Sequence, residues 1–184
     1  MKKLRFGIIG CSGIAESSTI PSILNSKYAD LEFIGSRTEK KSKEFANKFK
    51  CKKFGSYEDV LENDDVDAVY ISVPVGLHEK WSMKAAKKGK HILCEKSSTT
   101  SFSSAKKMVF ESKKNNIRLM EAFMFRFHPQ HSKVKELIKR NLLGKIYTFS
   151  GFYGFLPIPR TNIRFDKKLG GGILNDAGCY PICA

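Results

Sequence analysis

The sequence predicts an α/β fold in which helices cover both faces of a doubly wound parallel sheet, and three observations support this prediction. Apolar, β-branched runs recur through the first part of the chain and are typical of strands buried on both faces. Segments with helical periodicity separate these runs, as in βαβ units. A glycine-containing loop from Gly10 to Ala15 follows the first run and opens the first helix. Together these features indicate a Rossmann sheet whose strand ends meet ligands along one edge.

Each element of this sheet has a local signature in the sequence. Strands are expected at residues 4–9, 31–35, 68–73, 91–94 and 117–120. Helices are expected at residues 14–24, 38–49, 57–61, 78–88 and 101–114. Thr38 is typical of a helix start, Gly89 of a helix end, and Pro74 stops the third strand. Pro21 predicts a break or a restart within the first helix.

The pattern changes near Glu121, which predicts two domains, a Rossmann domain at residues 1–121 and a second part at residues 122–184. The second part begins with a helical pattern at residues 129–140 and strand-like alternation at residues 146–153. A proline loop at residues 157–159, a triple-glycine hinge at residues 170–172 and a short helix at residues 174–180 follow. We interpret it as the incomplete start of an α+β substrate domain, and the abrupt end at Ala184 as a sign of truncation.

Composition narrows the classes of protein to consider. The net charge of +15 suggests nucleic-acid binding as a possible function. However, only seven of the 33 basic residues are arginine and no nucleic-acid motif accompanies the scattered lysines, so we expect no nucleic-acid partner. No apolar run approaches the ~20 residues of a membrane span, and we expect a cytoplasmic protein without membrane contact. The five cysteines form no Cys-x-x-Cys pair, which predicts neither a metal site nor disulfides. Cys11 and Cys94 are expected to be small core residues.

The loop after the first strand resembles a dinucleotide-binding fingerprint. Gly10 permits the tight turn, and Ala15 is small enough for close packing of helix on strand. Backbone N–H groups at the start of the helix bind phosphate. Ser12 stands where a second glycine is usual, and it adds both a Cβ atom and a hydroxyl group. We expect the cofactor pyrophosphate at this loop, bound by Gly10, Ser12, Gly13, Ile14 and Ala15.

The end of the second strand bears on which cofactor is used. An NAD enzyme usually carries an acidic residue there to bind the ribose diol, whereas this chain has Ser36 and Arg37. A guanidinium group suits a 2′-phosphate, so NADP is favoured over NAD. The alternative is that Arg37 is a solvated loop arginine.

Longer blocks of sequence resemble the Gfo/Idh/MocA oxidoreductases, a family named after glucose–fructose oxidoreductase and inositol dehydrogenase. The matching residues lie in family order at 7–11 with 14–15, at Pro74 and His78, and at 89–96, 121–130 and 170–181. The fourth block and Tyr180 resemble the branch that contains glucose–fructose oxidoreductase, NADP-dependent xylose dehydrogenase and dimeric dihydrodiol dehydrogenase. The resemblance covers this whole chain but only the N-terminal half of a family member. It implies a second domain with a large sheet that carries substrate and subunit contacts, and hence a homo-oligomer for the full-length protein.

By this resemblance Lys96 is the catalytic lysine, and it follows a buried strand at the ligand edge of the sheet. Asp176 and Tyr180 are four residues apart, so a short helix would place them on one face. Tyr180 would donate or accept the proton of the reacting hydroxyl, and Asp176 would orient a substrate hydroxyl. A nearby Lys96 ammonium is expected to lower the pKa of Tyr180. The alternatives are that Lys96 is a surface lysine, that Tyr180 is a core aromatic residue and that Asp176 is an acid at the N-terminus of a helix.

The resemblance also implies roles for residues around this centre. Pro74, His78 and Glu95 would join Lys96 in binding the cofactor, with His78 near the nicotinamide. Arg126 would line the substrate side, although an arginine among aromatic residues is often only a structural stack. The family usually has proline after the catalytic lysine, and Ser97 replaces it here. Because proline makes a cis peptide accessible and serine does not, we expect the Lys96 backbone to be placed differently.

Two hypotheses follow from the sequence. The first is an NADP-dependent oxidoreductase that transfers a hydride between the nicotinamide and a CH–OH or C=O group of a sugar or related cyclic polyol, with a small carbohydrate-like substrate. Lys96, Asp176 and Tyr180 favour it. The second is a non-catalytic dinucleotide-binding module or a degenerate family member, which Ser97 and the abrupt end favour.

Overall fold

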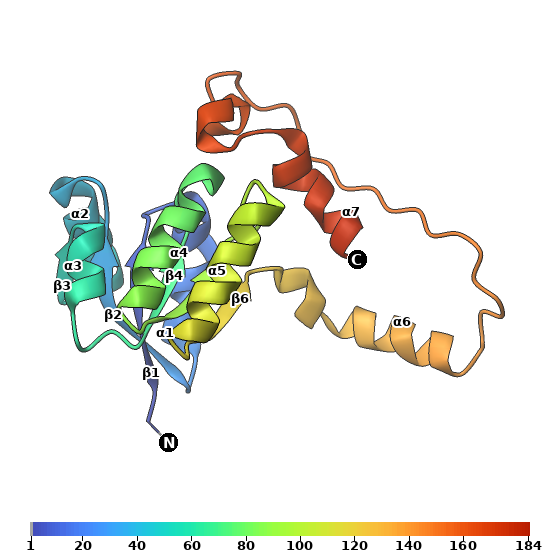
Figure 1. The fold of residues 1–184 in the computed structure, drawn as a ribbon, viewed down its shortest axis with the longest axis horizontal. Helices are drawn as coiled ribbons and strands as arrows, with labels where there is room; N and C mark the ends of the chain where they lie inside the picture. The colour runs from blue at the N-terminus through green and yellow to red at the C-terminus, as the bar shows by residue number, and fades with distance from the viewer. Residues whose placement is uncertain (1) are drawn as a thin grey trace.

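A computed structural model describes residues 2–184 and contains a single six-stranded sheet in the order β3-β2-β1-β4-β5-β6 (Figure 1). The strands are β1 Leu4–Ile9, β2 Ala29–Gly35, β3 Lys53–Gly55, β4 Ala68–Ile71, β5 His91–Cys94 and β6 Leu119–Glu121. Every neighbouring pair is parallel. This order and direction are those of the doubly wound Rossmann fold, so the predicted fold class is confirmed.

Helices follow each of the first five strands. The helical elements of the sheet domain are the π-helix η1 Ala15–Thr19, α1 Ile20–Asn25, α2 Glu39–Phe49, α3 Tyr57–Glu62, η2 Val75–Leu77, α4 His78–Lys87 and α5 Phe102–Lys114. Those that follow the sheet are η3 Met124–Phe127, α6 Pro129–Lys139, η4 Ile163–Phe165, η5 Lys167–Leu169, the π-helix η6 Leu174–Gly178 and α7 Cys179–Cys183. The start of α2 has the side-chain cap that the sequence predicts, because the Thr38 hydroxyl accepts a hydrogen bond from the Lys41 amide. The restart expected at Pro21 is also present, because the chain changes from π- to α-helix at Ile20.

The sheet buries a separate hydrophobic cluster on each face, because successive side chains of a strand point to opposite sides. Ile9 and Ile71 belong to the cluster that contains Trp81 of α4. Ile8 and Tyr70 belong to the opposite cluster, which packs against α1 and α2. Cys94 lies in the first cluster and Cys11 in the second, at 0% and 6% exposure, so their expected core positions are confirmed.

Glycine allows α3 to lie directly on the sheet. A Cβ atom on Gly7 of β1 or Gly35 of β2 would collide with the Val60 side chain, which is fully buried. The close approach of α3 brings the capped start of this helix next to the end of β2. The capping box there joins Ser56 and Asp59, whose side chain accepts from the Ser56 amide at 2.8 Å.

Two predictions about strands are wrong. β3 was not expected, because its three residues begin with lysine and carry no periodic signal. The strand expected at residues 146–153 is absent: within residues 2–184 no strand pairs with this segment, and a strand needs a hydrogen-bonded neighbour. The segment is instead part of an extended connection that follows α6, away from the sheet, and runs back toward α7 (Figure 1).

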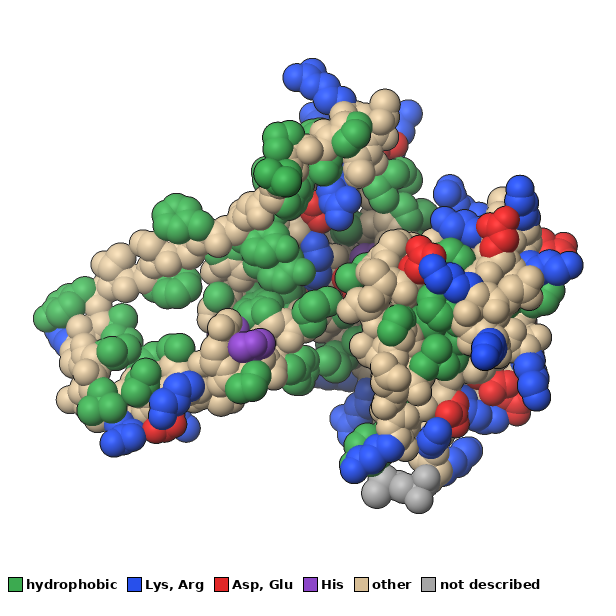
Figure 2. All heavy atoms as spheres, turned by 180° about the vertical axis from the view of Figure 1, so that it is seen from behind, with side chains coloured by type: hydrophobic (Ala, Val, Ile, Leu, Met, Phe, Trp, Pro, Cys, Tyr) green, Lys and Arg blue, Asp and Glu red, His purple; other side chains and the backbone are tan. Residues whose placement is uncertain are grey.

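Apolar side chains line this connection and α6 without being buried. Tyr147, Phe149 and Phe152 are 82%, 70% and 97% exposed. Figure 2 shows hydrophobic side chains along this part of the molecule, around the opening that it encloses. Among residues 2–184 no helix is both long and apolar enough to cross a membrane.

Candidate active site

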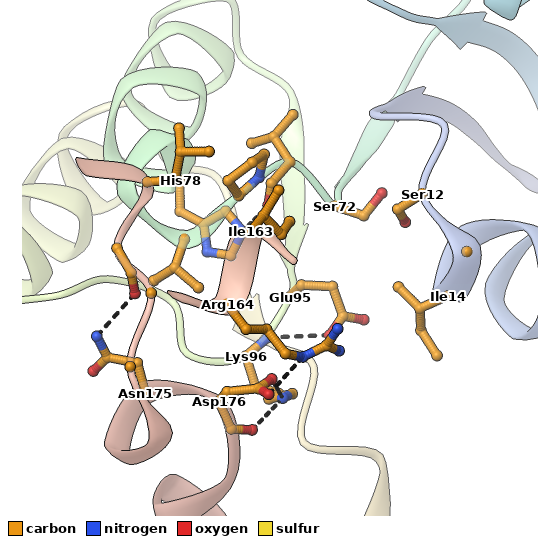
Figure 3. A pocket seen from close by; sticks show the side chains of 18 of the residues that line it. Ser12, Ile14, Ser72, His78, Glu95, Lys96, Ile163, Arg164, Asn175 and Asp176 are labelled. Atoms are coloured by element: carbon orange, nitrogen blue, oxygen red, sulfur yellow. Dashed lines mark hydrogen bonds and ion pairs between the residues drawn. The ribbon is translucent and has the colours of Figure 1, made fainter. Parts of the chain in front are cut away.

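A cavity of about 450 Å³ opens beyond the C-terminal ends of β1, β4 and β5. The loop from Ser12 to Ile14 lines one side of it, and Lys96 and Asp176 line another (Figure 3). Tyr180 lines the same cavity. Residues far apart in the sequence thus meet at the edge of the sheet where parallel α/β folds bind ligands. Pro74, His78 and Glu95 also line this cavity.

The loop after β1 has the geometry of a phosphate site. Gly10 has φ +113°, and a Cβ atom there would lie 3.0 Å from both the Ser72 carbonyl carbon and the Val73 amide nitrogen. A side chain at this position is therefore excluded by backbone conformation and by contact with the backbone after β4. The Ser72 hydroxyl donates to the Gly10 carbonyl at 2.7 Å and fixes the turn.

Ser12 acts as the cap of the helix that follows. Its hydroxyl oxygen accepts from the Ala15 amide at 3.1 Å, so the side chain satisfies one of the first N–H groups of the helix. The preceding amides, those of Gly13 and Ile14, have no acceptor within a helix that starts there, and they suit an anion. A Cβ atom on Gly13 would meet nothing within 4 Å. This loop therefore fits a dinucleotide pyrophosphate even though serine replaces the second glycine.

A second cavity of about 320 Å³ lies at the end of β2 and is lined by Ser36 and Arg37. Arg37 is exposed and takes part in no salt bridge within residues 2–184. Asp59 lines the same cavity, but its carboxylate already accepts from the amide of the helix cap. The Gly10 amide donates to the Gly35 carbonyl at 3.3 Å, which places this cavity beside the phosphate loop. The arrangement presents an exposed guanidinium, without a salt bridge among residues 2–184, in a cavity beside the phosphate loop.

Three side chains meet at the other end of the first cavity. The Lys96 ammonium donates to the Asp176 carbonyl oxygen at 2.5 Å and to the Asp176 carboxylate at 3.1 Å. It also lies 5.1 Å from the centre of the Tyr180 ring. The second Asp176 carboxylate oxygen accepts from the Arg164 guanidinium at 2.6 Å. Asp176 is thus held between two cations, of which Lys96 is largely buried and Arg164 half exposed.

The expectation that Lys96 lowers the pKa of Tyr180 is wrong. Burial raises the pKa of Tyr180 to about 12, and the neighbouring Tyr153 and Glu95 act in the same direction. The Lys96 ammonium faces the ring, and its charge is engaged by Asp176. Tyr153 stacks on Tyr180 at a ring distance of 4.4 Å and contributes to its burial. The Tyr180 hydroxyl is therefore protonated at neutral pH.

The backbone around Lys96 is held by buried side chains. The Glu95 carboxylate accepts from the Lys96 amide at 3.2 Å and from the Tyr70 hydroxyl at 2.6 Å. His78 is 1% exposed, and its two ring nitrogens lie 2.9 Å from the Ser97 carbonyl and 2.8 Å from the Val73 carbonyl. Burial lowers the pKa of His78. His78 therefore ties the segment after Lys96 to the end of β4.

Two features of the expected site differ in the structure. The Lys96–Ser97 peptide bond is cis, so the expectation that serine would exclude this conformation is wrong. The Ser97 hydroxyl donates to the Asn175 carbonyl at 2.9 Å, which attaches this segment to η6. Arg126 lies in η3, is exposed, and is not among the residues that line the cavity; Met124 of the same turn lines it instead.

Sequence reasoning missed Arg164, Tyr153 and Asn175, although all three line the cavity. Arg164 lies in the short turn η4 and Tyr153 at the end of the extended connection, and no spacing in the sequence marks either one as a partner of Asp176 or Tyr180. A local signal does accompany the site, because both π-helices of residues 2–184, η1 and η6, contain or adjoin residues that line it. Such π-helical turns often occur at functional sites.

Two family models match the chain. The first is described as an oxidoreductase family with an NAD-binding Rossmann fold and matches residues 4–123. The second is described as the GFO/IDH/MocA C-terminal domain and matches residues 131–184.

Curated relatives are similar over nearly the whole chain. The dTDP-3,4-didehydro-2,6-dideoxy-α-D-glucose 3-reductase of Actinomadura kijaniata is 36% identical, over 98% of this chain and 54% of that protein. A D-xylose 1-dehydrogenase (NADP⁺) of Haloferax volcanii is 38% identical, over 98% of this chain and 56% of that protein. The chain therefore spans about half the length of these relatives.

A solved structure is similar over the same range. A 3-ketoreductase from Actinomadura kijaniata, in complex with NADP and TDP-benzene, superposes with a TM-score of 0.94 at 36% identity. The superposition covers 98% of this chain and 56% of that protein. The aldose–aldose oxidoreductase of Caulobacter crescentus superposes with a TM-score of 0.86 at 26% identity, over 97% of this chain and 55% of that protein.

Proposed function

The chain belongs to the Gfo/Idh/MocA oxidoreductase family, and from this premise we propose that the full-length protein is an NADP-dependent oxidoreductase acting on a sugar or related cyclic polyol. The reaction is hydride transfer between the nicotinamide and a CH–OH or C=O group of the substrate. The observation that carries the proposal is that one cavity is lined both by Lys96, Asp176 and Tyr180 and by the loop from Ser12 to Ile14.

Each residue has a role that its contacts support. Bound NADP supplies the hydride donor or acceptor. The Tyr180 hydroxyl, protonated because its pKa is raised to about 12, donates a proton to the substrate oxygen in the reduction direction. The Lys96 ammonium stabilises negative charge on that oxygen. Asp176 holds Lys96 at 3.1 Å and, once that ion pair loosens, orients a substrate hydroxyl.

The preference for NADP rests on Arg37. A 2′-phosphate is the group that an exposed guanidinium in the cavity beside the phosphate loop binds well. The related xylose dehydrogenase is an NADP⁺ enzyme, and the related 3-ketoreductase was solved in complex with NADP. The relatives that act on xylose and on a dTDP-linked deoxyglucose support a sugar as the class of substrate.

Two measurements test this proposal. Fluorescence titration with NADPH and NADH measures cofactor binding, and tighter binding of NADPH is expected; failure to bind either would remove the basis for the site. Turnover of keto-sugars and aldoses by the full-length protein is then compared with that of Lys96→Ala. We expect kcat to fall by about 10²–10³-fold in Lys96→Ala, a larger change than that in NADPH affinity. Lys145→Ala is the matched control, because the Lys145 ammonium also lies over an aromatic ring, at 5.0 Å from that of Tyr147, outside the cavity.

A non-catalytic dinucleotide-binding module is the second candidate. The raised pKa of Tyr180 favours it, because with a pKa of about 12 almost none of the phenol is ionised at neutral pH to accept the proton of an alcohol. This candidate predicts NADPH binding without turnover of any sugar, and a binding affinity that is unchanged in both Lys96→Ala and Tyr180→Phe. Turnover by the unsubstituted full-length protein would exclude it.

A further inference from the structure

A buried tyrosine lies behind the segment that carries Lys96. Tyr70 lies in β4 with no exposed surface, on the face of the sheet that packs against α1 and α2. Its hydroxyl donates to the Glu95 carboxylate at 2.6 Å. Burial raises the pKa of Tyr70, and the charge and the hydrogen bond of Glu95 act in the same direction. Tyr70 therefore stays protonated and remains a donor across the working pH range.

The second oxygen of Glu95 continues this connection. It accepts a hydrogen bond from the backbone amide of Lys96 at 3.2 Å. This bond holds the backbone of the residue that carries the Lys96 side chain. Glu95 is 7% exposed, and its side chain lies beside that of Lys96 at the cavity wall (Figure 3). A buried carboxylate requires hydrogen-bond donors, and within residues 2–184 the donors to this one are Tyr70 and Lys96 itself.

We propose that Tyr70 is a positioning residue for Lys96, acting through the Glu95 carboxylate. The hydroxyl fixes the rotamer of Glu95, and the fixed carboxylate sets the direction of the Lys96 amide and hence the starting point of its side chain. Catalytic geometry is sensitive to shifts of about 1 Å, so loss of one buried hydroxyl behind the site has an effect on the reaction. The catalytic consequence rests on the proposed function, whereas the positioning itself does not.

The positioning is tested in the protein without substrate. The ¹⁵N–¹H signal of the Lys96 amide is recorded for the unsubstituted protein, Tyr70→Phe, Glu95→Gln and Tyr57→Phe. Tyr57 is the matched control, because it is also a buried tyrosine and packs on Trp81 instead of a carboxylate. We expect the Lys96 signal to shift in Tyr70→Phe and Glu95→Gln and to stay in place in Tyr57→Phe. An unmoved signal in Tyr70→Phe, or equal shifts in the control, overturns the proposal.

The catalytic consequence is tested by kinetics of the full-length protein. We expect Tyr70→Phe to lower kcat about tenfold to a hundredfold with the KM for NADPH unchanged. In Glu95→Gln the same tyrosine substitution should have almost no additional effect, because the two residues act as one unit. Additive effects, or a change in KM alone, would show that Tyr70 does not act through Glu95. If no substrate turns over but the amide signal shifts as expected, the proposed function fails and the positioning stands.

Discussion

Gly10 and Gly13 lie three residues apart in the phosphate loop, and we predict opposite consequences for their substitution by alanine. Gly10 has φ +113°, and a Cβ atom there would lie 3.0 Å from backbone atoms of Ser72 and Val73 that cannot move freely. Gly13 lacks such a φ, and nothing lies within 4 Å of the Cβ position. Gly10→Ala should therefore destabilise the fold. Gly13→Ala should leave the fold intact and hinder the binding of a ligand in the open space beside this residue.

The size of each effect follows from these contacts. At Gly10 the unfavourable backbone conformation costs about 1–3 kcal/mol, and relief of the close contact costs about 1–3 kcal/mol more. For a chain of this size the two together correspond to a Tm lower by about 4–24 °C. At Gly13 the lost flexibility of the unfolded chain stabilises the protein by up to about 1 kcal/mol. The new methyl group lies where the pyrophosphate would approach the Gly13 and Ile14 amides, so NADPH binding should weaken about tenfold or more.

Thermal unfolding followed by circular dichroism measures the stability of both variants, and fluorescence titration measures their affinity for NADPH. The expected pattern is a destabilised Gly10→Ala and a stable Gly13→Ala with impaired binding. A Gly10→Ala variant as stable as the unsubstituted protein would refute the reasoning from the turn geometry. A Gly13→Ala variant with full NADPH affinity would refute the position of the phosphate site.

Three further predictions concern charge. Arg37→Ala should weaken NADPH binding about tenfold to a hundredfold and leave NADH binding nearly unchanged, and an equal loss for both cofactors in the titration would contradict the 2′-phosphate assignment. The Arg5 guanidinium holds the pKa of Asp67 at about 2, below its usual 3.8, so the free energy of unfolding should decrease as the pH falls from about 4 to about 2. Urea unfolding should show a smaller decrease in the free energy of unfolding over this pH range for Asp67→Asn than for the unsubstituted protein. Identical pH profiles for the two proteins would exclude this ion pair as the cause. Ultraviolet titration should show that one phenol with a pKa of about 12 is missing in Tyr180→Phe, whereas loss of an ionisation at or below 10 would contradict the burial of this hydroxyl.

The sequence by itself determined the sheet domain and its phosphate loop. Buried parallel strands are continuous apolar runs and helices carry caps and breakers, so the order of elements up to β6 is encoded locally. The loop from Gly10 to Ala15 could be recognised because its context, between a strand and a helix, is also local. β3 could not be found in this way, since its three residues are defined only by pairing with β2.

Only the tertiary structure decided how the residues at the strand ends interact. Lys96 and Asp176 are 80 residues apart, and no pattern in the sequence predicts that Arg164 takes the second oxygen of the same carboxylate. The pKa of Tyr180 depends on burial and on a stacked Tyr153, both of which arise when distant segments pack together, and this is why the expected downward shift was reversed. Residues 146–153 alternate like a strand, but a strand is stabilised by hydrogen bonds to a neighbour, and residues 2–184 provide none for this segment.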